Sequence, residues 1–165
     1  MRVFLPATLA DVQRLLADGQ WMPLGGTGFA LTPALREAYV SGDDEELAEI
    51  ALRDAARASL RLLSAQEDGE LPVRRVVVVA ERDDASPRPD LDDAVVRISG
   101  PVSTDQVVAV HVDDGAAEPA VRAAAECIDV ADLGDEDAEL TLGDAEDHDL
   151  AWYATQELPF LLELL

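Results

Sequence analysis

The chain has 165 residues, of which 48% are hydrophobic, so it is long enough to bury a core as one domain (1–165) without disulfides or a structural metal. It contains 12 basic and 35 acidic residues, for a formal net charge of -23. Such a charge excludes non-specific nucleic-acid binding and docking on an anionic membrane, because both depend on clustered cations. The N-terminus lacks a signal-peptide pattern and no aliphatic run approaches a membrane span, so we expect a cytoplasmic protein.

The first half of the chain alternates short strands and helices. The pattern predicts a strand at 1–5, a helix at 9–18, a strand at 27–31, a short helix opened by Thr32-Pro33, and a long helix over about 43–64. The Gly-Gly-Thr-Gly segment at 25–28 precedes a strand and lacks the spacing of a phosphate-binding loop. We therefore interpret it as a turn.

The second half is strongly acidic, with 22 acidic residues and 3 Arg over 83–165. From residue 73 onward the pattern predicts a strand at 73–80, strands at 94–99 and 107–112 joined as a hairpin or short crossover, a helix from Pro119 to about 128, an acidic connector at about 129–147, and a C-terminal helix at about 144–157. In total, four or five mostly buried strands interleave with about five helices. This indicates one layer-type α/β or α+β domain, with parallel crossovers around the first two strands.

Two histidines stand among acidic residues and are the first candidates for chemistry. Imidazole and carboxylate groups bind divalent metals and act in acid–base catalysis. If the last helix packs over the end of the strand at 107–112, these groups converge. The metal candidates are His111, Asp113, Asp147 and His148, and the catalytic candidates are His111, Asp113, Asp114 and His148. The alternative is that both imidazoles are solvated or satisfied within the fold.

The acidic connector and an arginine ladder are the remaining charge signals. Asp135 and Asp137 in the connector offer a docking surface to a basic partner, although a solvated loop accounts for them as well. Arg53, Arg57 and Arg61 stand at i, i+4 and i+8 on the long helix, where like charges repel. The ladder could pair with the connector, or it could bind a phosphate- or carboxylate-bearing ligand.

The C-terminal segment supplies a candidate contact surface. Trp152 and Tyr153 are adjacent, so on a helix they project in different directions, and Gln156 shares the Trp152 face. One aromatic ring is expected in the core and the other at a groove or interface. With the apolar tail at 158–165, this is the expected surface for a homodimer or for a partner with an apolar surface. Ordinary core packing is the alternative.

Six segments resemble a family of short, acidic actinobacterial proteins that is a domain of unknown function. The resemblance runs nearly end to end and rests on MRVFLPATL (1–9), LTPALREAY (31–39), DAARASLRLL (54–63), VHVDD (110–114), GDEDAE (134–139) and AEDHDLAWYATQEL (145–158). It implies a single domain and a high-GC host. The family has no established activity, so the resemblance assigns no role to any residue.

These features fit two functions. The first is a non-catalytic cytoplasmic interaction or regulatory protein with an acidic docking surface for a basic or apolar partner. The second is a small metal-binding protein or enzyme built on His111, His148 and neighbouring carboxylates. We expect no cofactor, except a divalent metal in the second case. A nucleic-acid mimic that occupies a basic DNA-binding protein is a third candidate, disfavoured by the abundance of apolar strands.

Overall fold

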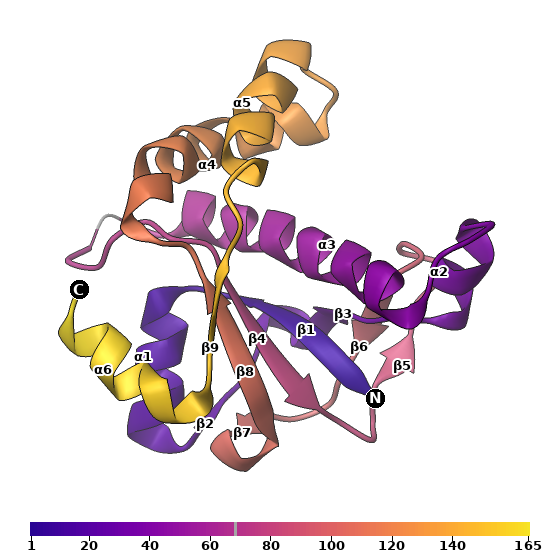
Figure 1. Ribbon diagram of the computed structural model, residues 1–165, viewed down its shortest axis with the longest axis horizontal. Helices are drawn as coiled ribbons and strands as arrows, with labels where there is room; N and C mark the ends of the chain where they lie inside the picture. The colour runs from indigo at the N-terminus through magenta and orange to yellow at the C-terminus, as the bar shows by residue number, and fades with distance from the viewer. Residues whose placement is uncertain (68) are drawn as a thin grey trace.

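The chain folds around one large antiparallel sheet with helices on both of its faces (Figure 1). The structure, a computed structural model, describes residues 1–67 and 69–165. The strands in these residues are β1 (Arg2–Ala7), β2 (Gln20–Trp21), β3 (Thr27–Phe29), β4 (Val76–Glu81), β5 (Ser86–Pro87), β6 (Val95–Arg97), β7 (Val102–Ser103), β8 (Val107–Val112) and β9 (Ala151–Tyr153). The α-helices are α1 (Leu9–Asp18), α2 (Pro33–Ala38), α3 (Asp44–Ala65), α4 (Glu118–Asp132), α5 (Glu136–Glu146) and α6 (Leu158–Glu163). The 3₁₀ turns are η1 (Leu24–Gly26), η2 (Thr104–Gln106), η3 (Gly115–Ala117) and η4 (Thr155–Glu157).

The sheet has the strand order β5-β6-β3-β1-β4-β8-β9, and β2 pairs with β7 separately. One face packs against α1 and α6, and the opposite face packs against α2 and α3. The end of α3 forms a third apolar cluster with α4 and α5, which lie together as a hairpin at one end of the molecule (Figure 1).

The valine run at 76–79 forms the central strand β4, as predicted. Side chains alternate along a strand, so Val76 and Val78 enter the core on the α1 side while Val77 and Val79 enter the core on the α3 side. All four are buried. A strand covered on both faces needs apolar residues at every position, which explains the unbroken run.

The strand count and direction differ from the prediction of four or five strands with parallel crossovers. Nine strands form among the described residues, and each pairing there is antiparallel. The additional strands β2, β5, β7 and β9 span two or three residues each, too short to produce a periodic signal. The segment 20–26 reverses the chain once more after α1, so β3 enters antiparallel to β1.

The acidic connector predicted at 129–147 is largely helical. Here α4 extends to Asp132, and α5 begins after Asp135, whose Oδ2 accepts a hydrogen bond from the Ala138 backbone N–H at 2.9 Å. Acidic residues in the first turn of α5 favour the helix because they face the positive end of its dipole. The acidic residues that are also typical of a solvated loop therefore include the N-cap residue and the first turn of a helix.

The helix predicted at 144–157 is also not present as such. Residues 144–157 instead form the end of α5, the strand β9 and the turn η4, and the helix α6 follows them. Trp152 and Tyr153 are residue types that favour strands, and pairing with β8 fixes them in one. Pro159 lies in the first turn of α6, where its missing N–H costs nothing, so it starts a helix instead of ending one.

The glycine segment at 25–28 is a turn that leads into β3, as interpreted from the sequence. Gly25 and Gly26 both have φ of 66°, a conformation that favours glycine. A Cβ atom on Gly26 would lie 2.3 Å from the backbone oxygen of Ile98, so the approach of β6 also requires glycine there.

In the described part of the chain, none of the helices combines the length and apolar character needed to cross a membrane.

Candidate functional site

A cleft of about 730 Å³ lies between α3, the end of β8 and residues 147–150, which link α5 to β9. A cavity of this size with several polar groups converging on it is the natural place to look for a binding site. Its titratable lining residues are Glu49, Arg53, Asp54, Arg57, Arg75, His111, Glu146, Asp147, His148 and Asp149. Leu52, Ala56, Leu60 and Leu150 supply the apolar part of the lining.

Both predicted histidines line this cleft. His111 is on β8, between Val77 of β4 and Trp152 of β9 in the strand register. His148 follows α5, and its backbone oxygen accepts a hydrogen bond from Arg75 Nη2 at 2.8 Å. That bond ties the 147–150 segment to the start of β4. Two imidazoles that are distant in the sequence therefore share one cavity.

The carboxylates next to His111 in the sequence have structural roles. Asp113 is fully buried, and its two oxygens accept hydrogen bonds from Arg75 Nη2, Nε and backbone N–H, each at 2.8 Å. Asp114 accepts a hydrogen bond from the Ala117 backbone N–H at 3.2 Å and caps η3. Asp147 is exposed at the end of α5 and does line the cleft. Of the predicted set, His111, Asp147 and His148 remain at the cavity.

The described residues hold no group of three or more His, Cys, Asp and Glu side chains placed to bind a metal ion. The engagement of Asp113 with Arg75 accounts for part of this result, because it removes one of the four predicted ligands. We therefore describe the cleft by its charged side chains and its two imidazoles.

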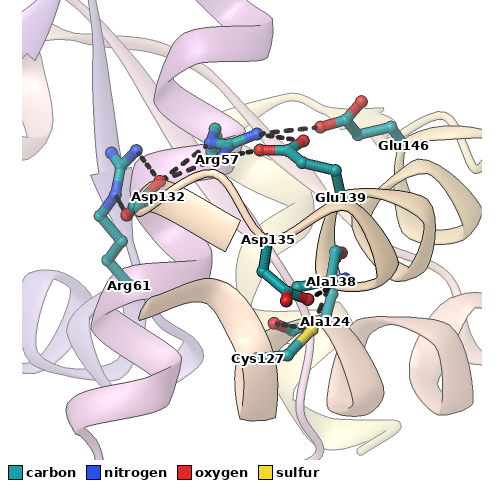
Figure 2. Close-up of polar contacts among 9 residues, drawn as sticks. All are labelled: Arg57, Arg61, Ala124, Cys127, Asp132, Asp135, Ala138, Glu139 and Glu146. Carbon is teal, nitrogen blue, oxygen red and sulfur yellow. Dashed lines mark hydrogen bonds and ion pairs between the residues drawn. The ribbon is translucent and has the colours of Figure 1, made fainter. Parts of the chain in front are cut away.

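Two arginines of the ladder pair with the acidic helices, one of the alternatives considered from the sequence (Figure 2). Arg57 Nη2 lies 3.0 Å from Asp132 Oδ1 and 2.8 Å from Glu139 Oε1, and Arg57 Nη1 lies 3.9 Å from Glu146 Oε1. Arg61 Nε lies 2.7 Å from Asp132 Oδ2. The hydrogen bond to Glu139, with further contributions from Asp132, raises the pKa of Arg57. These bridges hold the α4–α5 hairpin against α3.

Some charged side chains of the cleft form ion pairs with other described residues and others do not. Arg57 is paired with the α4–α5 hairpin and Arg75 with Asp113. Arg53 is exposed and forms no ion pair within residues 1–67 and 69–165. Four lining carboxylates likewise lack an ion-pair partner among those residues: Glu49, Asp54, Asp147 and Asp149. The unpaired groups therefore comprise four carboxylates and one guanidinium, which leaves the cleft with an excess of negative charge.

Burial shifts two groups in the cleft toward their neutral forms. It raises the pKa of Asp54, with a further rise from the nearby Asp92 and an opposing effect of Arg61 and Arg57. Burial lowers the pKa of His111, and Glu49 opposes that shift. Both side chains are half-buried, and desolvation disfavours the charged form of any group.

Comparison with known protein families shows which family the chain belongs to. A family of unknown function (DUF6912) matches residues 1–162. The chain belongs to this family. Membership confirms the expectation of a domain of unknown function that runs nearly end to end, and it brings no activity or site with it. No curated protein and no solved structure matches the chain.

The residues predicted to contact a partner are spread over several elements. Trp152 is on β9, with 59% of its surface exposed, while Tyr153 points to the opposite face and packs on the core beside α1 and α6. Gln156 is exposed in η4. Asp137 is exposed in the first turn of α5, and Asp135 caps that helix. Of these residues, only Trp152 lies next to the cleft, because it is paired across β9 and β8 with His111, a residue of the cleft lining.

Sequence reasoning missed Glu49, Asp54, Arg75 and Asp149 as cleft residues. Glu49 and Asp54 share α3 with the arginine ladder, and nothing in their spacing separates them from solvated helix residues. Arg75 did offer a signal, because it directly precedes the fully buried valine run and so needs a buried partner.

Proposed function

We propose that the protein is a non-catalytic interaction protein whose cleft receives a cationic segment of a partner protein. The observation behind the proposal is the charge imbalance of the cleft: among the described residues Arg57 and Arg75 form ion pairs, while four of the lining carboxylates do not. The attraction of a cation to these four carboxylates exceeds its repulsion by the guanidinium of Arg53. Partial burial strengthens the attraction, because charges interact more strongly where water is excluded.

Asp54 supports the same ligand class. Its pKa is raised because it is partly buried, so ionisation of this carboxyl is penalised in the free protein. A bound cation would favour the ionised form of this carboxyl and offset the effect of its burial. Binding of a cation and ionisation of Asp54 are then linked.

The size of the cleft sets the scale of the contact. A volume of about 730 Å³ lies in the range of cavities that hold a small ligand or a few side chains. A basic peptide segment fits this scale better than a folded domain. The formal net charge of -23 would add long-range attraction for such a segment and speed its association at low salt.

The proposal is tested by calorimetric titration of the protein with a basic peptide at low ionic strength. Changing Glu49→Gln together with Asp149→Asn should weaken binding roughly ten-fold, as the loss of two partly screened ion pairs implies. The charge-matched control is Glu136→Gln with Asp137→Asn on exposed positions of α5, which should change affinity little. Equal losses in both double variants would indicate attraction to net charge alone and overturn the proposal.

Arg53 separates this proposal from an anion-binding role. If the cleft receives cations, Arg53→Gln removes a repulsive charge and should raise affinity for the basic peptide. If the ladder binds a phosphate or carboxylate, the same change should abolish binding of inorganic phosphate or acetate. Titration of the wild-type and Arg53→Gln proteins with each probe distinguishes the two.

A small acid–base enzyme is the second candidate, favoured by the placement of His111, His148 and Asp54 around one cleft. An imidazole with a lowered pKa is a suitable proton acceptor near neutral pH, and a raised pKa makes a carboxyl a better proton donor than an ordinary one. Titration with Zn²⁺ or Mn²⁺ tests the metal-dependent version. Saturable binding that disappears in His111→Ala and in His148→Ala would favour this candidate.

We also propose a cytoplasmic location. The single cysteine, Cys127, is a free, half-buried thiol, and a chain with no second cysteine gains nothing from an oxidising compartment. Labelling of Cys127 with a membrane-impermeant thiol reagent in intact and lysed cells tests the location. Labelling only after lysis is the expected result.

A further inference from the structure

Trp152 is the largest exposed aromatic side chain next to the cleft. It lies on β9, the edge strand of the sheet, directly opposite His111 on β8. Residues opposite one another on paired strands point to the same face, so the indole lies beside the His111 imidazole on the α3 side of the sheet. No strand follows β9 at this edge in the described residues. Trp152 is therefore an exposed residue at the sheet edge whose strand partner, His111, lines the cleft.

The exposure of Trp152 contrasts with its surroundings. Trp21 is only 4% exposed in the core, and Tyr153 packs against the core from the other face of β9. Trp152 is 59% exposed although its indole is a large apolar group. Tryptophan in such a position is typical of a contact surface, because burying its ring against a partner is strongly favourable.

The indole and the carboxylates of the cleft differ in which cations they prefer. Carboxylates attract ammonium and guanidinium groups alike. An indole face selects the guanidinium, which is planar and weakly hydrated and can stack on the ring, whereas an ammonium remains strongly hydrated. An exposed indole beside His111, at the edge of a cleft that Glu49 and Asp149 line, thus combines the two elements that recognise arginine.

We infer that Trp152 makes this cleft selective for arginine over lysine, by stacking on the guanidinium group of an arginine side chain from the partner. The inference rests on the proposed function, because it takes the cleft to receive a cation. It adds that the partner segment presents arginine and that the strand β9 supplies the selectivity. Trp152 acts here as a binding residue, with no part in any reaction.

The test compares two peptides, Gly-Arg-Gly-Arg-Gly and Gly-Lys-Gly-Lys-Gly, with identical blocked ends. Wild-type protein should bind the arginine peptide roughly two- to five-fold more tightly, the range expected for one exposed cation–π contact. Binding should also change the tryptophan fluorescence, and because Trp21 is buried this signal reports on Trp152. Trp152→Ala should remove both the preference and the signal, and Trp152→Phe should retain a smaller preference. Tyr153→Phe, on the other face of β9, is the control and should leave both unchanged.

Each outcome of this test is decisive. If both peptides bind wild-type protein equally and Trp152→Ala changes neither affinity, the inference is wrong while the proposed function stands. If neither peptide binds, the proposed function fails and the inference fails with it. If Trp152→Ala instead converts a dimer into a monomer in sedimentation, the indole belongs to a contact between copies of this chain, which overturns the inference.

Discussion

Arg75 and Asp113 form a buried ion pair where β4 begins and β8 ends. Arg75 Nη2 lies 2.8 Å from Asp113 Oδ1, and Arg75 Nε lies 2.8 Å from Asp113 Oδ2. The side chains are 3% and 0% exposed. Arg75 Nη2 also reaches the backbone oxygen of His148, so the pair connects two strands of the sheet to the segment that forms one wall of the cleft.

The first prediction concerns the stability of this pair. Asp113→Asn leaves the Arg75 charge buried without its partner, so we expect a loss of about 3–5 kcal/mol in the free energy of unfolding. Asp90→Asn is the matched control, because Arg88 and Asp90 form the same two-bonded geometry in solvent. The control should change stability little. Urea denaturation of the three proteins measures the difference, and similar losses in both variants would contradict the prediction.

The second prediction concerns the Gly25-Gly26 turn. Gly26→Ala places a Cβ atom against the Ile98 backbone oxygen and forces a non-glycine residue into a positive φ, which costs at least about 1–3 kcal/mol. Gly143→Ala within α5 meets no neighbouring atom and should stabilise the protein by about 0.5–1 kcal/mol. Thermal unfolding should therefore move in opposite directions in the two variants. A downward shift in both would be inconsistent with this account of the turn.

The sequence was sufficient to predict features that depend on local chemistry. The capping of α1 by Thr8 and Asp11 is visible in their spacing, and both hydrogen bonds of the capping box are present. The strand at 76–79 follows from its valines. The pairing of Arg57 and Arg61 with acidic residues follows from charge, and it is one of the two alternatives that the sequence offers for the ladder.

Features that depend on distant partners could not be predicted. Trp152 is in a strand because the edge of β8 is available for pairing, and the sequence of the segment 151–153 does not indicate that β8 is its partner. The cleft is assembled from α3, β8 and the 147–150 link, so its membership depends on topology. The proximity of the two histidines was a hypothesis conditional on the packing of the chain's end, whereas Glu49 and Asp54 had no distinguishing signal at all.

The third prediction concerns the α4–α5 hairpin. Within the described part of the chain, Arg57 bridges to Asp132, Glu139 and Glu146, whereas Arg61 bridges to Asp132 alone. Arg57→Met should therefore leave more carboxylates unbalanced and speed amide hydrogen exchange in α5 more than Arg61→Met does. Added salt should reduce the difference between the variants, because it screens the repulsion. Faster exchange in α5 for Arg61→Met than for Arg57→Met would contradict the account of these bridges.

The fourth prediction concerns pH. Burial lowers the pKa of His111 below its ordinary value of 6.5, so the folded protein binds fewer protons than the unfolded chain over the window just below that value. The free energy of unfolding should then fall as the pH falls through about 6.5 toward the folded-state pKa. His111→Gln should remove this part of the pH dependence. Urea denaturation at several pH values measures it, and an unchanged slope in the variant would show that His111 is not responsible.

The account centres on the cleft between α3, the end of β8 and the 147–150 link as the place where a cationic segment binds. Amide and imidazole NMR shifts during titration with Gly-Arg-Gly-Arg-Gly test this most directly, because they locate the contact without any substitution. The account predicts saturable shifts concentrated at Glu49, His111, His148, Asp149 and the Trp152 indole N–H. Shifts spread evenly over the exposed acidic residues of α4 and α5, with the cleft unaffected, would contradict it.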